Sequence, residues 1–131
     1  MVCHRRAGKT VAAVNDLLRG VIACEQPRPQ FAYVAPFRDQ AKRVAWDYLK
    51  YYSEPIWADK PNEAELTIRL LGDAKVSVFG ADNADALRGI YLDGAFLDEF
   101  GDFKPSVWGN VIRPALSDRQ GWAVFGGTPK G

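Results

Sequence analysis

Apolar residues recur along this chain with two different periods, which divides it into predicted helices and strands. Residues 9–24 carry apolar side chains at steps of three and four, so they are predicted to form an amphipathic helix that ends before Pro27. The same spacing predicts a second helix over residues 39–52. Short apolar runs bounded by turn-forming or charged residues predict strands at 31–35, 94–97 and 122–125.

Between the second helix and residue 94 the period changes to two. Apolar and polar residues alternate over 66–70 and again over 76–78, and Gly72-Asp73 between them predicts a hairpin turn. A further helix is expected to start near Pro105, because proline suits a first helical turn, and to end before Pro114. The order of strands and helices predicts an α/β layered domain with a mainly parallel sheet.

Composition and charge narrow the class of protein. The 131 residues are enough for one domain. A composition of 47% hydrophobic and 25% charged residues excludes a disordered tail or a low-complexity scaffold. Seventeen basic residues against 16 acidic ones give a net charge of +1, so any DNA contact is expected to be local or supplied elsewhere. No apolar run approaches the roughly 20 residues that span a bilayer. Cys3 and Cys24 have no metal-ligand spacing, which predicts a reduced, cytosolic setting.

Residues 3–10 match the phosphate-binding pattern G-x-x-x-x-G-K-[ST] at every fixed position except the first, where Cys3 replaces glycine. The pattern requires a strand end before it and a helix after it, here expected to start near Lys9. Gly8 is predicted to turn the backbone so that N–H groups face phosphate. Lys9 would reach the β- and γ-phosphates, and Thr10 would offer a hydroxyl to Mg²⁺. The alternative is a chance Gly-Lys-Thr in an ordinary strand-to-helix turn.

Two arginines inside this loop favour an anionic ligand. Arg5 and Arg6 repel each other and Lys9, so their clustering is unfavourable unless an anion compensates it; the alternative is a solvated basic loop. The predicted nucleotide-binding residues are Arg6, Ala7, Gly8, Lys9 and Thr10.

An acidic pair follows the apolar run 94–97. Open parallel sheets bind ligands outside the carboxyl ends of their strands, where this pair is predicted to lie. Asp98 would hold Mg²⁺, through a water molecule, and Glu99 would polarise the attacking water as a general base. The alternative is a pair of surface acids in a loop, since Asp-Glu dipeptides are common.

Two further residues are candidates for roles in catalysis. Thr128 follows the last predicted strand and could hydrogen-bond the γ-phosphate, although a threonine capping a glycine-rich turn is the simpler interpretation of this residue taken alone. Arg88 lies about ten residues before Asp98, where it could enter a neighbouring subunit's site as an arginine finger. Its alternative is a surface arginine in a loop.

Taken together, these segments resemble the ATPase domain of tailed-bacteriophage large terminase subunits. The resemblance extends along the whole chain, and the combination is far more specific than any one motif. The segments that carry it are His4-Arg5-Arg6-Ala7-Gly8-Lys9-Thr10, Tyr33-Val34-Ala35-Pro36 with Gln40-Ala41, Gly80-Ala81-Asp82-Asn83, Leu87-Arg88-Gly89, Leu97-Asp98-Glu99 and Gly127-Thr128-Pro129-Lys130-Gly131.

The resemblance implies a P-loop NTPase of the additional-strand, catalytic-glutamate type: a three-layer fold with a mainly parallel central sheet and a β-hairpin insertion. It implies a Mg²⁺-dependent ATPase that drives double-stranded DNA into procapsids, in the host cytoplasm and with no membrane association. The implied partners are the small terminase subunit, the portal and further copies in a ring. Arg5 matches the family's loop arginine, Arg88 resembles the arginine offered in trans, and Thr128 matches the coupling threonine.

Family members also carry an adenine-contacting segment before the loop and a nuclease domain after the ATPase. Residues 1–131 are therefore expected to be a partial ATPase domain without those two parts, weakly stable and weak in nucleotide affinity by itself. Two other functions stay open on the sequence: a helicase-like or repair ATPase with the same core, and a catalytically silent fragment that docks on a partner.

Overall fold

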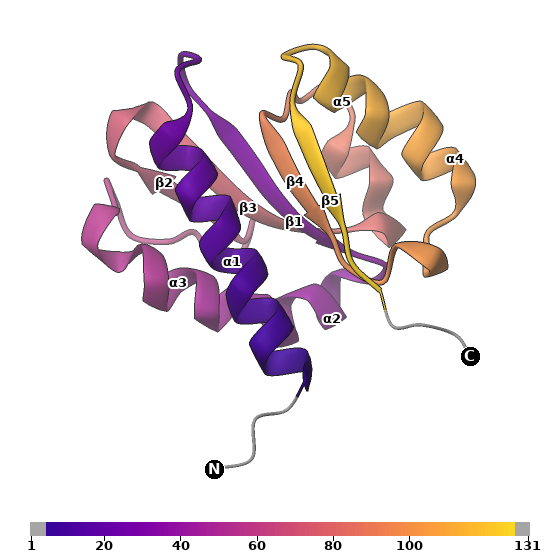
Figure 1. The fold of residues 1–131 in the computed structure, drawn as a ribbon, viewed down its shortest axis with the longest axis horizontal. Helices are drawn as coiled ribbons and strands as arrows, with labels where there is room; N and C mark the ends of the chain where they lie inside the picture. Colours follow the sequence, from indigo (N-terminus) through magenta and orange to yellow (C-terminus); the bar gives the residue numbers. More distant parts are fainter. Residues whose placement is uncertain (1–4, 128–131) are drawn as a thin grey trace.

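A computed structural model describes residues 5–127, and the side chains of residues 8–127. Its centre is a five-stranded sheet with strand order β2-β3-β1-β4-β5 (Figure 1). Every neighbouring pair is parallel except β2 and β3, which are antiparallel. The strands are β1 (Gln30–Ala35), β2 (Thr67–Leu70), β3 (Ala74–Gly80), β4 (Gly94–Leu97) and β5 (Trp122–Phe125). The predicted α/β architecture with a mainly parallel sheet is confirmed.

Helices cover both faces of the sheet, which gives three layers (Figure 1). On one face α1 (Arg5–Ala23) and α3 (Asp47–Ser53) pack over alternate β1 residues such as Phe31 and Tyr33. On the other face Ala32 and Val34 of β1 join a second core cluster with the helices of residues 105–117. Because successive strand residues point to opposite faces, the fully apolar run of β1 supplies both cores.

The second predicted helix is present as three consecutive segments. These are α2 (Arg38–Ala41), a π-helical turn η1 (Lys42–Trp46) and α3. The short 3₁₀ segment η2 (Glu54–Ile56) then ends the helix at Pro55. The spacing of apolar residues therefore predicted the position of this helix correctly, but it did not predict the π-helical turn.

The predicted hairpin is present, with Gly72 and Asp73 at its turn. Both residues have positive φ, 79° and 61°, within the 3₁₀ segment η3 (Leu71–Asp73). Glycine adopts this conformation without steric cost, and aspartate tolerates it better than most residues. After β3, the 3₁₀ segment η4 (Ala81–Leu87) leads to the face of the sheet that the helices of residues 105–117 cover.

The last helical region differs from the prediction at its end. It comprises α4 (Pro105–Val107), a π-helical turn η6 (Trp108–Ile112) and α5 (Arg113–Ser117), so it continues past Pro114. A proline inside a helix lacks an N–H donor, and its ring clashes with the carbonyl four residues earlier. The wide turn immediately before Pro114 accounts for how the helix accommodates it. Among the described residues no helix is long and apolar enough to cross a membrane.

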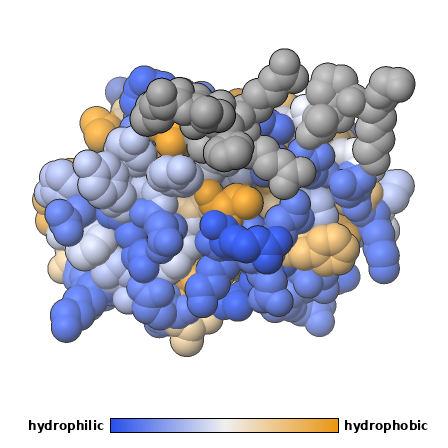
Figure 2. All heavy atoms as spheres, turned by 90° about the horizontal axis from the view of Figure 1, so that it is seen from below, coloured by the Kyte–Doolittle hydropathy of each residue, from blue (hydrophilic) through white to orange (hydrophobic). Residues whose placement is uncertain are grey.

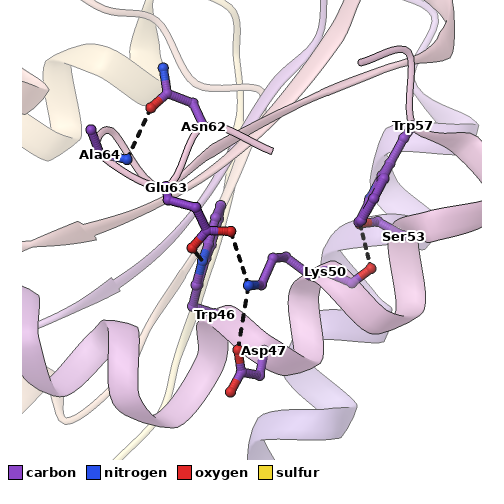
Figure 3. Close-up of polar contacts among 8 residues, drawn as sticks. All are labelled: Trp46, Asp47, Lys50, Ser53, Trp57, Asn62, Glu63 and Ala64. Atoms are coloured by element: carbon purple, nitrogen blue, oxygen red, sulfur yellow. Dashed lines mark hydrogen bonds and ion pairs between the residues drawn. The ribbon is translucent and has the colours of Figure 1, made fainter. Parts of the chain in front are cut away.

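A polar cluster holds the 57–66 segment against η1 and α3 (Figure 3). The indole of Trp46 donates a hydrogen bond to Glu63 Oε1 at 2.8 Å, and Lys50 Nζ lies 3.0 Å from Glu63 Oε2. These two donors lower the pKa of Glu63, with the Trp46 hydrogen bond the larger cause. The Trp57 indole donates to Ser53 Oγ at 2.9 Å in the same region. The cluster holds the segment that leads into β2.

Candidate nucleotide-binding site

The carboxyl ends of the parallel strands and the start of α1 lie at the same end of the molecule, the lower end in Figure 1. Figure 2 views this end directly: hydrophilic residues cover most of the visible surface, and hydrophobic residues form small separate patches. The 3₁₀ segment η5 (Phe100–Asp102) follows β4 at this end. Such an edge of an open α/β sheet is where polar ligands bind.

Lys9 and the acidic pair meet here, although 89 positions separate Lys9 from Asp98 in the sequence. Lys9 Nζ lies 3.3 Å from Asp98 Oδ1 and 3.9 Å from Glu99 Oε1. The three side chains are 34%, 13% and 16% exposed, so the two carboxylates are largely withdrawn from water while the lysine remains accessible. One ligand could therefore contact the amine and both acids together.

Tyr33 and Thr10 lie beneath this ion-paired group. The phenol of Tyr33 donates a hydrogen bond to Asp98 Oδ2 at 2.7 Å, and Tyr33 is fully buried. Burial, followed by the Asp98 hydrogen bond, strongly raises the pKa of Tyr33, so its hydroxyl stays protonated. Thr10 is also buried, and its side chain lowers the pKa of Tyr33, against the larger effects of burial and Asp98. The side chains of Thr10 and Asp98 therefore both act on the Tyr33 hydroxyl, and only Asp98 accepts a hydrogen bond from it.

The start of α1 differs from the expected phosphate loop. The helix begins at Arg5, not near Lys9, and Gly8 lies within it; the glycines with positive φ among residues 5–127 are Gly72 and Gly89. Arginine, alanine and lysine are good helix formers, and a single glycine lowers helix stability by only about 1 kcal/mol. The expectation that Gly8 turns the backbone is therefore wrong for this structure.

The helical start still leaves donors for an anion. The first four N–H groups of an α-helix have no partner within the helix, and they carry the positive end of its dipole. The first turn of α1 contains no acidic residue that would compete for them. Arg5, Arg6 and Ala7 open this helix, and their side chains lie outside the described part of the chain.

Backbone geometry fixes the acidic pair at the end of β4. The Asp98 N–H donates to the Val34 carbonyl at 2.7 Å, which extends the β1–β4 pairing by one bond. Glu99 then has φ 51° and ψ 46°, the left-handed region that non-glycine residues seldom adopt. A residue held there in a strand-to-loop turn stores roughly 1 kcal/mol or more of strain and is typical of functional sites.

The end of β5 closes the other side of the site. Gly126 donates to the Leu97 carbonyl at 2.9 Å and accepts from the Phe100 N–H at 3.1 Å, so it is fixed against the turn after β4. A Cβ at this position would lie 2.6 Å from Phe96 Cζ and 3.0 Å from Lys9 Cε. Glycine at 126 therefore leaves the space that Lys9 and Phe96 fill.

Of the two remaining predicted residues, Arg88 does not join this group. Arg88 is exposed, forms an ion pair with Asp85 at 3.1 Å and lines a shallow groove with Pro114 and Asp118. Thr128 lies outside the described residues. Tyr33 and Gly126, by contrast, were not among the predicted site residues. In the sequence alone, Tyr33 is one of several hydrophobic residues in the strand 31–35, and Gly126 is one glycine of a glycine-rich turn.

The donor set suits a hard divalent cation held jointly with a phosphate ligand. The described residues contain no group of three or more His, Cys, Asp or Glu able to hold a metal. Mg²⁺ characteristically takes one or two protein oxygens and completes its shell with phosphate oxygens and water. The hydroxyl of the buried Thr10 and the carboxylate of Asp98 are two such oxygens.

The chain is similar in sequence to large terminase subunits of Thermus phages. It is 51% identical to the large terminase subunit of Thermus phage G20c and 32% identical to that of Thermus virus P23-45, each over 97% of this chain. The chain spans 30% of the length of these two relatives. No protein-family profile matches it.

Solved structures give the same relationship. The ATPase domain of the Thermus phage P74-26 large terminase superposes with a TM-score of 0.78 at 28% identity, covering 97% of this chain and 57% of that domain. The large terminase of another thermophilic bacteriophage, at 20% identity, has the same fold with a TM-score of 0.71 over 95% of this chain and 32% of its own. In both sequence and fold, this chain is similar to phage large terminases, and the solved structure that it matches at the highest TM-score given above is an ATPase domain.

Proposed function

We propose that this chain is the ATP-hydrolysing core of a DNA-packaging motor, and that residues 1–131 form part of one P-loop ATPase domain. The observation that carries the proposal is the meeting of Lys9 with Asp98 and Glu99 at the carboxyl edge of the sheet, beside the N-terminus of α1. A triphosphate bound with a metal ion needs N–H donors and a positively charged side chain for its phosphates, and carboxylates for the metal. This edge of the sheet supplies all three.

Each group has a role that follows from its chemistry. The N–H groups at the start of α1 and the Lys9 ammonium bind phosphate oxygens, with Arg6, Ala7, Gly8, Lys9 and Thr10 as the nucleotide-binding residues. Thr10 and Asp98 hold Mg²⁺, which supplies charge neutralisation at the phosphates when bound. Glu99 accepts a proton from the attacking water as general base.

The remaining assignments rest on the family relationship. Arg5 stabilises charge on the phosphates in cis, Arg88 is offered to a neighbouring subunit, and Thr128 couples the γ-phosphate to conformational change. The exposure of Arg88 supports a role at a subunit contact. The left-handed Glu99 at the end of β4, together with the β2–β3 hairpin, supports the additional-strand, catalytic-glutamate type of P-loop NTPase with a hairpin insertion.

The larger function follows from the relatives. We propose that the motor acts on double-stranded DNA in the host cytoplasm, as part of a ring of copies that works with a portal and a small terminase subunit. The similarity of the chain to large terminase subunits supports this proposal.

The test is Glu99→Gln, which keeps the size and hydrogen-bonding capacity of the side chain but removes its basicity. We expect the variant to bind Mg²⁺·ATP with an affinity within about threefold of wild type and to lose phosphate release by roughly 100-fold or more. Glu25→Gln, at an exposed position beyond α1, is the matched control and should leave both quantities unchanged. Phosphate release by Glu99→Gln at the wild-type rate would remove Glu99 as the base, and a wild-type protein that binds no ATP would remove the whole proposal.

A further inference from the structure

Tyr33 places a polar group where the core needs none. It lies in the middle of β1, is fully buried, and packs on the same face of the sheet as Phe31. Phe31 provides an aromatic ring to that face without a hydroxyl, so core packing alone does not explain the phenol oxygen of Tyr33. A buried hydroxyl must also make a hydrogen bond or lose several kcal/mol of hydration. The partner it makes, Asp98, therefore identifies what the hydroxyl does.

The Asp98 carboxylate is held from two sides. Lys9 Nζ faces Oδ1 at 3.3 Å, and the Tyr33 hydroxyl donates to Oδ2 at 2.7 Å. A carboxylate with one oxygen fixed by a buried donor cannot rotate freely about its terminal bond, so the other oxygen keeps a constant direction. In Asp98 that other oxygen is the one that faces Lys9 and the accessible part of the site.

The Tyr33 ring is itself held in position. Tyr33 pairs with Phe96 in the β1–β4 register, and the two rings stack with centroids 5.4 Å apart and planes 24° apart. The Phe96 ring fills the space that the missing side chain of Gly126 leaves. A fixed ring gives its hydroxyl a fixed direction, which is what orienting a neighbouring carboxylate requires.

We propose that Tyr33 is a positioning residue of the site: its hydroxyl orients the Asp98 carboxylate toward a divalent cation bound with the nucleotide. The inference rests on the proposed function, because the cation belongs to that site. Outer partners that orient a metal-binding side chain change metal affinity by about 10–100-fold when they are removed.

The experiment compares two tyrosine-to-phenylalanine variants of the whole protein. Tyr33→Phe removes the hydroxyl and keeps the ring that stacks on Phe96. Tyr91→Phe is the control, because the Tyr91 hydroxyl makes one hydrogen bond of the same length, 2.7 Å, to the Arg28 carbonyl at the opposite edge of the sheet. Binding of Mn²⁺ in the presence of saturating ADP, followed by electron paramagnetic resonance, reports metal affinity without turnover.

We expect Tyr33→Phe to weaken Mn²⁺ binding about tenfold and Tyr91→Phe to leave it unchanged. In an Asp98→Asn background, Tyr33→Phe should cause no further loss, since its effect passes through Asp98. A Tyr33→Phe protein that binds Mn²⁺ within twofold of wild type overturns the inference. So does an equal additional loss in the Asp98→Asn background, which is what a general effect on packing would give.

The same measurement separates this inference from the function on which it rests. A wild-type protein that binds no Mn²⁺ with ADP overturns both the proposed function and the role of Tyr33. Wild-type binding that Tyr33→Phe leaves intact overturns the role of Tyr33 alone. Thermal unfolding of both phenylalanine variants checks the fold: equal melting temperatures with unequal Mn²⁺ affinities support positioning, and a loss of affinity that merely follows a loss of stability contradicts it.

Discussion

Replacing Gly126 by alanine tests how closely the end of β5 packs against the site. The added Cβ would lie 2.6 Å from Phe96 Cζ and 3.0 Å from Lys9 Cε. Carbon atoms in ordinary contact are about 3.5–4.0 Å apart, so the Phe96 ring would have to retreat by about 1 Å and the lysine chain by about half as much. Lys9 is flexible, but the Phe96 ring is stacked on the buried Tyr33 and has no free direction.

Forcing one extra carbon into a packed region costs about 1–3 kcal/mol. We therefore expect Gly126→Ala to lower the free energy of unfolding by about 2 kcal/mol, and Tm by roughly 6–10 °C for a chain of this size. Because Lys9 is also displaced, ADP affinity should fall about tenfold. Thermal unfolding followed by circular dichroism and calorimetric titration with Mg²⁺·ADP measure the two effects.

Gly127→Ala is the matched control for this prediction. A Cβ on the neighbouring Gly127 has nothing within 4 Å, so the same substitution one residue later should change neither Tm nor affinity. If Gly126→Ala melted within 1 °C of Gly127→Ala and bound ADP equally well, the packing of Lys9 against β5 would not hold in solution.

Two further predictions concern stability away from the site. Glu63 has a lowered pKa, so its bonds to Trp46 and Lys50 stabilise the fold above the ordinary carboxylate pKa and lose effect as pH falls through the lowered value. Glu63→Gln should be slightly less stable than wild type in chemical denaturation at pH 7, and the difference should disappear once the pH is below the lowered pKa of Glu63. Arg119 pairs with the buried Asp93 at 3.3 Å, so Arg119→Met should lose about 3 kcal/mol in urea unfolding by leaving that carboxylate buried without its cation; an unchanged midpoint would contradict this.

Much of the fold follows from hydrophobic periodicity, because each element buries one face. The apolar run 94–97 and the alternation around Gly72 both correspond to observed strands. Helix ends were less predictable. Pro114 was expected to end a helix, but the helix continues past it after a π-helical turn. The helix α1 starts at Arg5, earlier than expected, because its first residues have a high helix propensity. Local propensity does not reveal where such segments end.

The part of the site that follows from a general rule of parallel sheets could be predicted from the sequence. The part that depends on the register between strands could not. Lys9 and Asp98 were expected to meet because parallel strands present their carboxyl ends at one edge. Tyr33 was not, since a tyrosine in an apolar strand resembles any other core aromatic until its neighbour across the sheet is known. Gly126 likewise acquires meaning only when Phe96 and Lys9 are placed beside it.

The site and the core are one structure at this edge of the sheet. Tyr33 of β1 contacts both Asp98, at the end of β4, and Phe96, within β4, and the Phe96 ring occupies the space beside Gly126 at the end of β5. These contacts depend on the parallel register that pairs Tyr33 with Phe96. A slip of one residue would turn Tyr33 to the opposite face, into the core cluster where β1 places only Ala32 and Val34. The orientation of Asp98 is therefore set by the same strand pairing that buries the centre of the protein, and it cannot be lost or regained independently of the sheet.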